Sequence, residues 1–353
     1  MRITLTGALL HLSDTGRTES RPLADTDQTR FADWAARYDS QIRANASDDL
    51  ISIGRDLFAW LDGPAHWLAS FAQGNGPRIL EPSVETQPDD LARVFLDLPW
   101  ELLADKAGFL AGDIERPLLL ARRLGSPVSP APPRHRDLLL LFMAAQPEGE
   151  TVLDYEAEEA GILDATAPLD LHLRVEESGC LPYLEQRLRE GDPVEALHLS
   201  CHGTIEDNEP VLALETPEGR RHIVGVPDLL GALGADKPPL LFLSACRTAE
   251  QPSAALSLVL RMVRAGVSNV IGWDGSVYDS DAAAFARTFY KALIGSASPY
   301  AAAMARQDLL REHLADPRRG RHWHLARVFM GPAGGGPLCH SSQPGRAWPK
   351  EIG

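Results

Sequence analysis

Two short apolar runs, each of which ends in a reactive residue, constrain the fold of this chain more than any other feature. The first runs from Glu195 to Gly203 and the second from Leu240 to Thr248, and each ends abruptly at small or polar residues. Apolar runs of this length are typical of strands that are buried on both faces of a sheet. If the two strands are neighbours in a parallel sheet, their carboxyl ends open into one crevice, where such sheets place their active sites.

The rest of the carboxyl-terminal half repeats this strand pattern and alternates it with helices. We expect strands at 137–145, 171–175, 267–273 and 324–330, a hairpin at 211–215 and 221–224, and helices at 155–165, 181–190, 227–233, 254–265, 280–294 and 299–315. Strands that alternate with helices form a parallel sheet covered on both faces. The sequence therefore predicts an α/β fold for residues 137–331.

The amino-terminal part has a different rhythm and predicts an α+β domain over residues 1–125. We expect a strand at 2–11, a turn at 13–21 into a weaker strand, helical structure over 27–73, strands at 77–80 and 92–98, and a short helix from Pro99. Residues 126–136 contain four prolines in eleven positions, which predicts a linker between the two domains. The glycine-rich segment 332–353 is expected to be a flexible tail.

Composition narrows the class of protein. A formal charge of −15 argues against direct binding of nucleic acid. Four scattered cysteines are too few for a disulfide framework, and no apolar run approaches the ~20 residues of a membrane span or resembles a secretory signal. We therefore expect a cytoplasmic protein that has reduced thiols and no contact with a membrane.

His202 and Cys246 are the candidate reactive residues, because each closes one of the two apolar runs. A buried cysteine is more often a small hydrophobic residue, and a histidine at a strand end often only bonds to backbone. However, small residues precede Cys246, and the helix expected within about eight residues would favour its thiolate. Gly203 follows His202 and leaves room for a close approach.

His198 and Cys201 lie close to His202 in the sequence and raise the alternative of a metal site, which the alternation of side chains along a strand disfavours. His198 shares the face of His202 but sits deeper, so we expect a structural role, and Cys201 points to the opposite face into the core. This split disfavours a zinc site, and no C-x-x-C spacing is present. The chain has neither nucleotide-binding motif nor a G-x-S-x-G elbow. We expect no metal and no cofactor.

The same residues carry a resemblance to a known family. His202-Gly203 and Ser244-Ala-Cys246, 44 residues apart, resemble the caspase-type cysteine proteases, although Ser-Ala-Cys-Arg-Thr departs from the caspase Gln-Ala-Cys signature. The closer similarity is to the CHAT family, bacterial caspase-like proteases related to separase. It rests on Leu98-Pro-Trp-Glu-Leu-Leu103, Leu240–Cys246, Val270-Ile-Gly-Trp273 with Asp279-Ser-Asp281 and Phe289-Tyr290, and His322–Gly331. The resemblance implies a caspase-like, mostly parallel sheet.

The resemblance also implies a mechanism. Cys246 would attack the scissile carbonyl, His202 would give a proton to the leaving amine, and the backbone N–H groups of Gly203 and Cys246 would hold the oxyanion. No third member of a triad is evident in the sequence, and in this family backbone contacts often position the histidine.

Relatives of the family often accept a basic P1 residue that acidic side chains hold. Asp274, which directly follows Trp273, is the leading candidate for the floor of that pocket. Asp279 and Asp281 are alternatives, although either could simply cap a helix. The acidic loop at 206–209 could receive a cationic peptide or be a solvated turn.

We therefore expect a cytoplasmic cysteine endopeptidase that cleaves a protein substrate after Arg or Lys. The family implies control by a regulatory protein or a fused sensor module, in bacterial antiviral defence or signalling such as CRISPR-associated systems. No repeat module is visible in the sequence, which predicts a sensor on a separate chain or beyond residue 353. The rival hypothesis is a catalytically silent scaffold that uses the caspase-like fold for binding, against which the presence of both His202 and Cys246 argues.

Overall fold

The central strands of the carboxyl-terminal half are parallel, as expected. The computed structural model describes residues 1–339 apart from 15, 69–75, 134–136, 208 and 247–252. Strand β9 (Ala196–Glu206) pairs in parallel with β7 (Leu138–Ala144) on one side and β12 (Leu240–Cys246) on the other. Strand β8 (Leu171–Glu176) lies outside β7, and β13 (Asn269–Trp273) lies beyond β12, both again parallel.

Antiparallel strands complete this part of the sheet. The hairpin β10 (Glu209–Glu215) and β11 (Arg221–Val224) extends it beside the end of β9, and β14 (Ala326–Met330) pairs with β13. The fold is thus of the α/β class, with the mostly parallel sheet that the sequence predicted.

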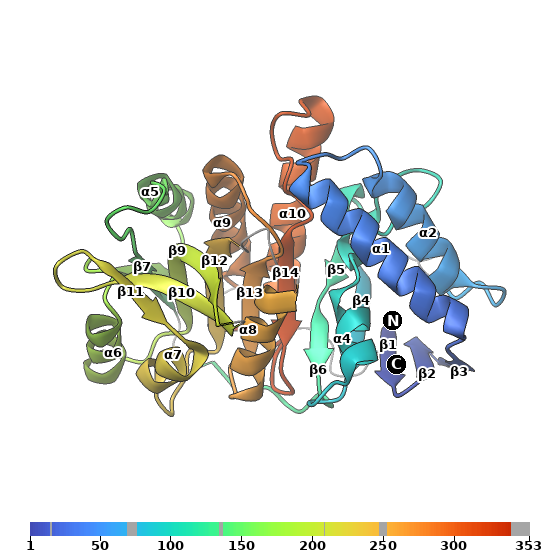
Figure 1. Ribbon diagram of the computed structural model, residues 1–353, viewed down its shortest axis with the longest axis horizontal. Coiled ribbons are helices and arrows are strands. Elements are labelled where there is room, and N and C mark those ends of the chain that lie inside the picture. The colour runs from blue at the N-terminus through green and yellow to red at the C-terminus, as the bar shows by residue number, and fades with distance from the viewer. Residues whose placement is uncertain (15, 69–75, 134–136, 208, 247–252, 340–353) are drawn as a thin grey trace.

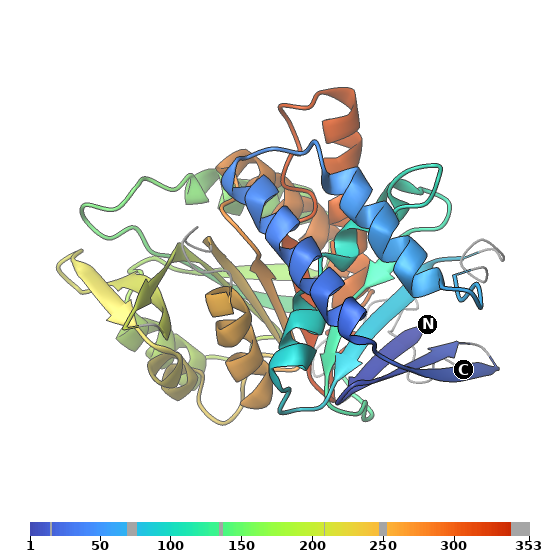
Figure 2. The same ribbon diagram turned by 45° about the vertical axis from the view of Figure 1, so that its right-hand side comes forward.

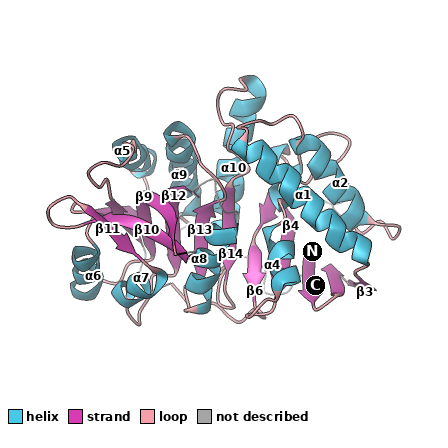
Figure 3. Ribbon diagram, in the orientation of Figure 1, coloured by secondary structure: helices cyan, strands magenta, loops and turns pink. Residues whose placement is uncertain are grey.

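Helices cover both faces of this sheet, and its strands β7, β12 and β13 are correspondingly largely apolar (Figures 1 and 3). One layer holds α5 (Tyr155–Thr166), α9 (Asp279–Leu293) and α10 (Ser298–Ala315). The other holds α6 (Leu181–Glu190), α7 (Val226–Leu233) and α8 (Ser253–Arg264). Phe242 of β12 contacts the rings of Phe285 and Phe289 of α9, which assigns the even-numbered side chains of β12 to the α9 face.

The amino-terminal part adds strands to the same sheet rather than forming a separate one. A meander of β1 (Arg2–Thr6), β2 (Leu9–Asp14) and β3 (Arg17–Pro22) ends the sheet, and β4 (Arg78–Val84) runs parallel to β1 and to the short β5 (Leu118–Leu120). Strand β6 (Arg122–Leu124) pairs in parallel with both β4 and β14. Through β6 the sheet is continuous across the two halves.

The helices of this part pack beside the strands (Figure 2). They are α1 (Asp25–Arg43), α2 (Leu50–Asp62), α4 (Asp90–Asp97) and the short 3-10 helices η1 (Trp100–Leu102) and η2 (Leu110–Gly112). No helix within the described ranges is long and apolar enough to cross a membrane.

Three expectations for the secondary structure need correction. Residues 92–98 are not a strand but the end of α4: Asp89 caps the helix by accepting a hydrogen bond from the Ala92 N–H, and Ala92, Phe95 and Leu96 are buried at helical spacing. The strand expected at 2–11 is divided by Gly7, whose φ of 54° forms a turn between β1 and β2. Most of the turn expected at 13–21 is strand instead: Ser13 and Asp14 end β2, and β3 spans Arg17–Pro22.

The segments expected to be linker and tail lie against each other. Residues 126–133 have no regular secondary structure, and the Val128 N–H donates a hydrogen bond to the Pro332 carbonyl. The first part of the expected flexible tail, 332–339, is packed in place: Leu338 and Cys339 are buried, and the Gly335 N–H donates to the Asn269 side chain. The remainder of that segment, 340–353, lies outside the described residues.

Candidate functional site

The register between two strands places the candidate reactive residues side by side. In the parallel pair of β9 and β12, Cys246 lies directly opposite His202. His198 of the same strand contacts Tyr290 of α9, and Ser200 contacts Glu158 of α5, so His202 belongs to the face that these helices cover. The side chain of Cys246 lies outside the described residues, as does the segment 247–252, and helix α8 begins at Ser253.

The His202 ring is held by one of its two nitrogens. Its Nε2 lies 2.7 Å from the backbone carbonyl oxygen of Thr151, in the loop between β7 and α5. A carbonyl oxygen can only accept, so Nε2 carries the proton and Nδ1 of the neutral ring is free to accept one. The same carbonyl accepts a second hydrogen bond from Gln146 Nε2 at 3.0 Å, which fixes the loop. This contact involves a backbone atom of a distant loop, so no side-chain pattern in the sequence points to it.

Gly203 lies one residue beyond the stretch of β9 that pairs with β12. The β12 register ends at His202, whereas β9 continues to Glu206 and pairs there with β10, with Gly203 opposite Leu212. On the β12 side, the backbone beyond His202 has no strand partner within the described part of the chain. The role of Gly203 and Cys246 as oxyanion donors stays a prediction.

A buried polar layer lies directly beneath the two candidate residues. Ser200 and Ser244 precede His202 and Cys246 by two positions and share their face, and both donate hydrogen bonds to the carboxylate of Glu158 on α5, at 2.9 and 3.0 Å. Burial alone would raise the pKa of Glu158, but His198 and the two hydroxyl groups hold it below its ordinary value. In the sequence, this layer is indicated by Ser200 and Ser244, which each lie two residues before a candidate reactive residue. No pattern in the sequence around residue 158 indicates that Glu158 contacts them.

The structural interpretation of His198 and Cys201 is confirmed. His198 is fully buried: its Nδ1 lies 3.0 Å from the Tyr290 hydroxyl, and its Nε2 lies 3.3 Å from Glu158 without the alignment of a hydrogen bond. Cys201 is 2% exposed in the core on the other face. Among the described residues, no group of three or more His, Cys, Asp and Glu side chains is arranged to hold a metal ion.

Asp274, the leading candidate for the P1 pocket, is not brought to the His202 face. Asp274 and Ala245 line a small cavity together with Leu258 and Val259 of α8, on the opposite side of the sheet. Its carboxylate forms an ion pair with Arg327, in which both side chains are 4% exposed. The charge of Asp274 is therefore already matched inside the protein.

Asp281 is also engaged internally, whereas Asp279 accepts a single hydrogen bond and forms no ion pair within the described residues. The Asp281 carboxylate accepts hydrogen bonds from the backbone N–H groups of Gly320 and His322 and contacts the His322 ring. Asp279, at the exposed start of α9, accepts one hydrogen bond, from the backbone N–H of Asp154. Asp154 belongs to the loop whose Thr151 carbonyl holds His202. Of the three aspartates, Asp279 is therefore the one that contacts this loop.

The acidic loop 206–209 is largely neutralised by basic neighbours. Glu206 forms an ion pair with Arg221, and Glu209 forms one with Arg261. These partners weaken its expected attraction for a cationic peptide.

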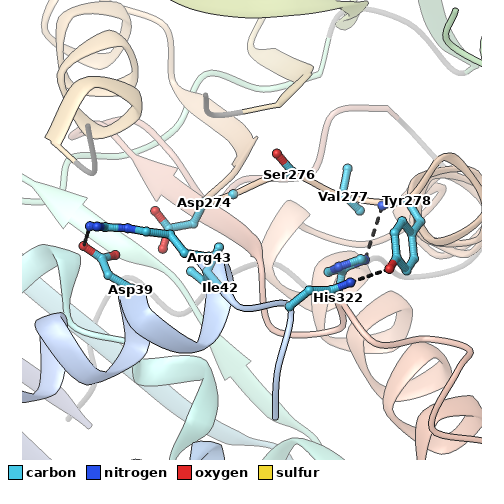
Figure 4. A pocket seen from close by; sticks show the side chains of 10 residues that line it. Asp39, Ile42, Arg43, Asp274, Ser276, Val277, Tyr278 and His322 are labelled. Carbon is cyan, nitrogen blue, oxygen red and sulfur yellow. Dashed lines mark hydrogen bonds and ion pairs between the residues drawn. The ribbon is translucent and has the colours of Figure 1, made fainter. Parts of the chain in front are cut away.

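A larger cavity of about 220 Å³, which Asp274 also lines, lies between the end of α1 and the segment that follows β13 (Figure 4). Tyr278 and His322 close one side, where the Tyr278 N–H donates to the His322 ring. Ile42 and Arg43 of α1 line the other side. The amino-terminal part therefore reaches the carboxyl ends of the central strands.

Comparison with solved structures finds weak similarity to distant proteins. Two structures of the separase–securin complex from Saccharomyces cerevisiae match with 14% sequence identity and a TM-score of 0.41, over 71% of this chain and about 15% of the separase chain. Caspase-1 from Spodoptera frugiperda matches with 12% identity and a TM-score of 0.37, over 60% of this chain and 96% of that chain. A comparison with curated proteins finds no match.

The family comparison agrees with the motifs in the sequence. The family model of the CHAT domain matches residues 55–332, which include η1, the strands that carry His202 and Cys246, and the closing strand β14. The expected resemblance is thereby confirmed. Because this match spans most of the chain, the protein belongs to the CHAT domain family.

Proposed function

We propose that the protein is a cysteine endopeptidase in which His202 and Cys246 form the catalytic dyad. The observation that carries this proposal is the register of β9 and β12, which aligns the two residues at the carboxyl end of a parallel pair. The bond from His202 Nε2 to the Thr151 carbonyl supports it, because it leaves Nδ1 as the base. Membership of the CHAT family and the caspase-like fold support the same class of chemistry.

In the proposed reaction, the Cys246 thiol gives its proton to Nδ1 of His202, and the sulfur attacks the scissile carbonyl carbon. The backbone N–H groups of Gly203 and Cys246 stabilise the resulting oxyanion, and one such donor contributes about 3 kcal/mol. The imidazolium then gives the proton to the leaving amine as the C–N bond breaks. Water, deprotonated by His202, attacks the thioester and releases the acid and the free thiol.

A basic P1 residue is the proposed specificity, and Asp279 is the residue that we assign to it. Asp279 is exposed on the His202 face, next to the loop that holds the histidine, and no described cation forms an ion pair with it. A carboxylate in this setting is free to form a charge-assisted hydrogen bond with an incoming Arg or Lys. Asp274 and Asp281 lack that freedom, because Arg327 and the 320–322 segment already occupy them.

The test compares the wild type with Cys246→Ala and His202→Ala on internally quenched peptides that contain Arg, Lys or neither, alone and with candidate activating proteins. We expect cleavage on the carboxyl side of Arg or Lys by the wild type only, with a loss of at least about a thousandfold in either variant. Equal cleavage by wild type and Cys246→Ala would contradict the proposal. Tight binding of a peptide or protein without cleavage would instead favour the scaffold hypothesis.

Control of the enzyme by a regulatory protein or sensor, and its place in the cytoplasm, stay part of the proposal. The same assay addresses control, because an activating partner is detected as an increase in Cys246-dependent cleavage.

A further inference from the structure

One buried carboxylate binds both strands of the proposed dyad. Ser200 and Ser244 lie on neighbouring strands, each two residues before a member of the dyad, and both hydroxyl groups donate to Glu158. Two residues along a strand is the shortest step that returns to the same face. The Glu158 carboxylate therefore bridges β9 and β12 about one residue pair below His202 and Cys246.

Burying the Glu158 carboxylate destabilises the fold unless hydrogen-bond donors replace its hydration. Glu158 is 4% exposed, and a buried carboxylate requires partners to offset the loss of hydration. Its oxygens are met by the two serine hydroxyls and by His198, whose other ring nitrogen contacts Tyr290. An apolar side chain at position 158 would fill the same part of the core without losing the hydration of a charge. We therefore attribute the charge of Glu158 to function rather than to stability.

Glu158 also connects to His202 by a second route. It lies in the first turn of α5, directly after the loop whose Thr151 carbonyl holds the His202 ring. Asp154 caps this helix by accepting a hydrogen bond from the Ala157 N–H. A shift of α5 on the sheet therefore moves the carbonyl that orients His202 as well as the strand ends.

We propose that Glu158 is a positioning residue for the dyad, fixing His202 and Cys246 relative to each other through Ser200, Ser244 and the Thr151 loop. The inference rests on the proposed function, since it explains how the same two residues are aligned. Small displacements of reacting groups are costly: about 1 Å reduces rates by about a hundredfold.

The test measures the alkylation rate of Cys246 by iodoacetamide from pH 5 to pH 9, followed by mass spectrometry of the peptide that contains Cys246. This readout needs neither a substrate nor an activator. A cysteine paired with a protonated histidine reacts at low pH, whereas an isolated thiol reacts only near its ordinary pKa of about 8.5. The proteins compared are the wild type, His202→Ala, Glu158→Gln and Glu156→Gln.

Glu156→Gln is the matched control. Glu156 lies in the same first turn of α5 and its replacement removes the same charge from the helix end, but its side chain is exposed. Glu158→Gln keeps the shape of the side chain, and thermal unfolding verifies that the variant is folded. Ser244→Ala is the second variant, and it removes one arm of the bridge while Glu158 keeps its charge and its bond to Ser200.

We expect Glu158→Gln and Ser244→Ala to shift the alkylation profile toward that of His202→Ala, with a rate at pH 6 that is about tenfold lower, while Glu156→Gln matches the wild type. A folded Glu158→Gln variant with the wild-type profile would overturn the positioning role and leave the dyad intact. A wild-type profile identical to that of His202→Ala would instead show that the two residues are not coupled, and the proposed function itself would fail. In a peptidase assay, Glu158→Gln should lower kcat about tenfold and leave KM within about twofold.

Discussion

At the scale of the residue, the immediate partners of an aspartate determine whether its charge is matched inside the protein or is available to a ligand. Arg327 lies between Asp97 and Asp274, and this ion-pair set joins the end of α4 to β14 and the end of β13. Burial would lower the pKa of Arg327, but the two carboxylates raise it well above its ordinary value. Asp279, in contrast, is exposed, and no cation among the described residues pairs with it. Two aspartates five residues apart thus have opposite expected roles.

Substitution by asparagine separates these roles. Asp274→Asn removes one partner from a buried cation, so it should lower the free energy of unfolding by about 2 kcal/mol and leave the preference for Arg over neutral P1 residues unchanged. Asp279→Asn should leave stability within about 0.5 kcal/mol but reduce kcat/KM for Arg peptides about tenfold. Chemical denaturation and peptide kinetics on both variants check this. Loss of Arg preference in Asp274→Asn alone would restore Asp274 to the pocket.

At the scale of the element, the sequence predicts much of the sheet and less of what surrounds the site. The apolar runs and the helices between them predict the strands of the carboxyl-terminal half, because burial on both faces demands continuous apolar residues. Residues 92–98 were misassigned because a short apolar segment fits a strand as well as a helix until the Asp89 cap is recognised. Glu158 and Thr151 were missed since they meet the dyad strands only through folding, 42 to 86 positions away in the chain.

The same limit applies to the connection between the two halves. Pairing of β6 with β14 joins segments that are more than 200 residues apart, and no local pattern encodes such a register. The motif Leu98–Leu103 gains a physical role here. Its Glu101 is 1% exposed, forms two hydrogen bonds with Arg122 of β6, and lies 3.7 Å from Arg306 of α10.

At the scale of the whole molecule, two buried groups that join the halves make stability depend on pH. Burial alone would raise the pKa of Glu101, but Arg122 and Arg306 lower it from 4.5 to about 2. Burial, with a contribution from His322, lowers the pKa of His324 from 6.5 to about 3; this ring bonds to the Tyr38 hydroxyl of α1. In both cases the unfolded chain binds the proton more readily, so the free energy of unfolding falls as the pH falls.

The pH ranges in which His324 and Glu101 affect stability differ, so the two contributions can be measured separately. Loss of stability through His324 begins below pH 6.5 and is complete near pH 3, whereas loss through Glu101 begins only below about pH 4.5. We therefore expect the Tm to decrease between pH 6.5 and pH 4.5, and to decrease less steeply in His324→Asn. Differential scanning calorimetry of both proteins across this range provides the check. Parallel curves for wild type and variant would show that His324 does not titrate on unfolding.

Labelling by a peptidyl-arginine chloromethyl ketone tests most directly whether His202 and Cys246 form a catalytic dyad beside a site for a basic side chain. It requires a nucleophilic Cys246, a histidine that activates it and a site for a basic side chain, all in one reaction. We predict a single adduct, located on Cys246, that forms at least about tenfold more slowly in His202→Ala and with a neutral residue in place of arginine. An adduct on another residue, or equal labelling rates in the wild type and His202→Ala, would contradict the account.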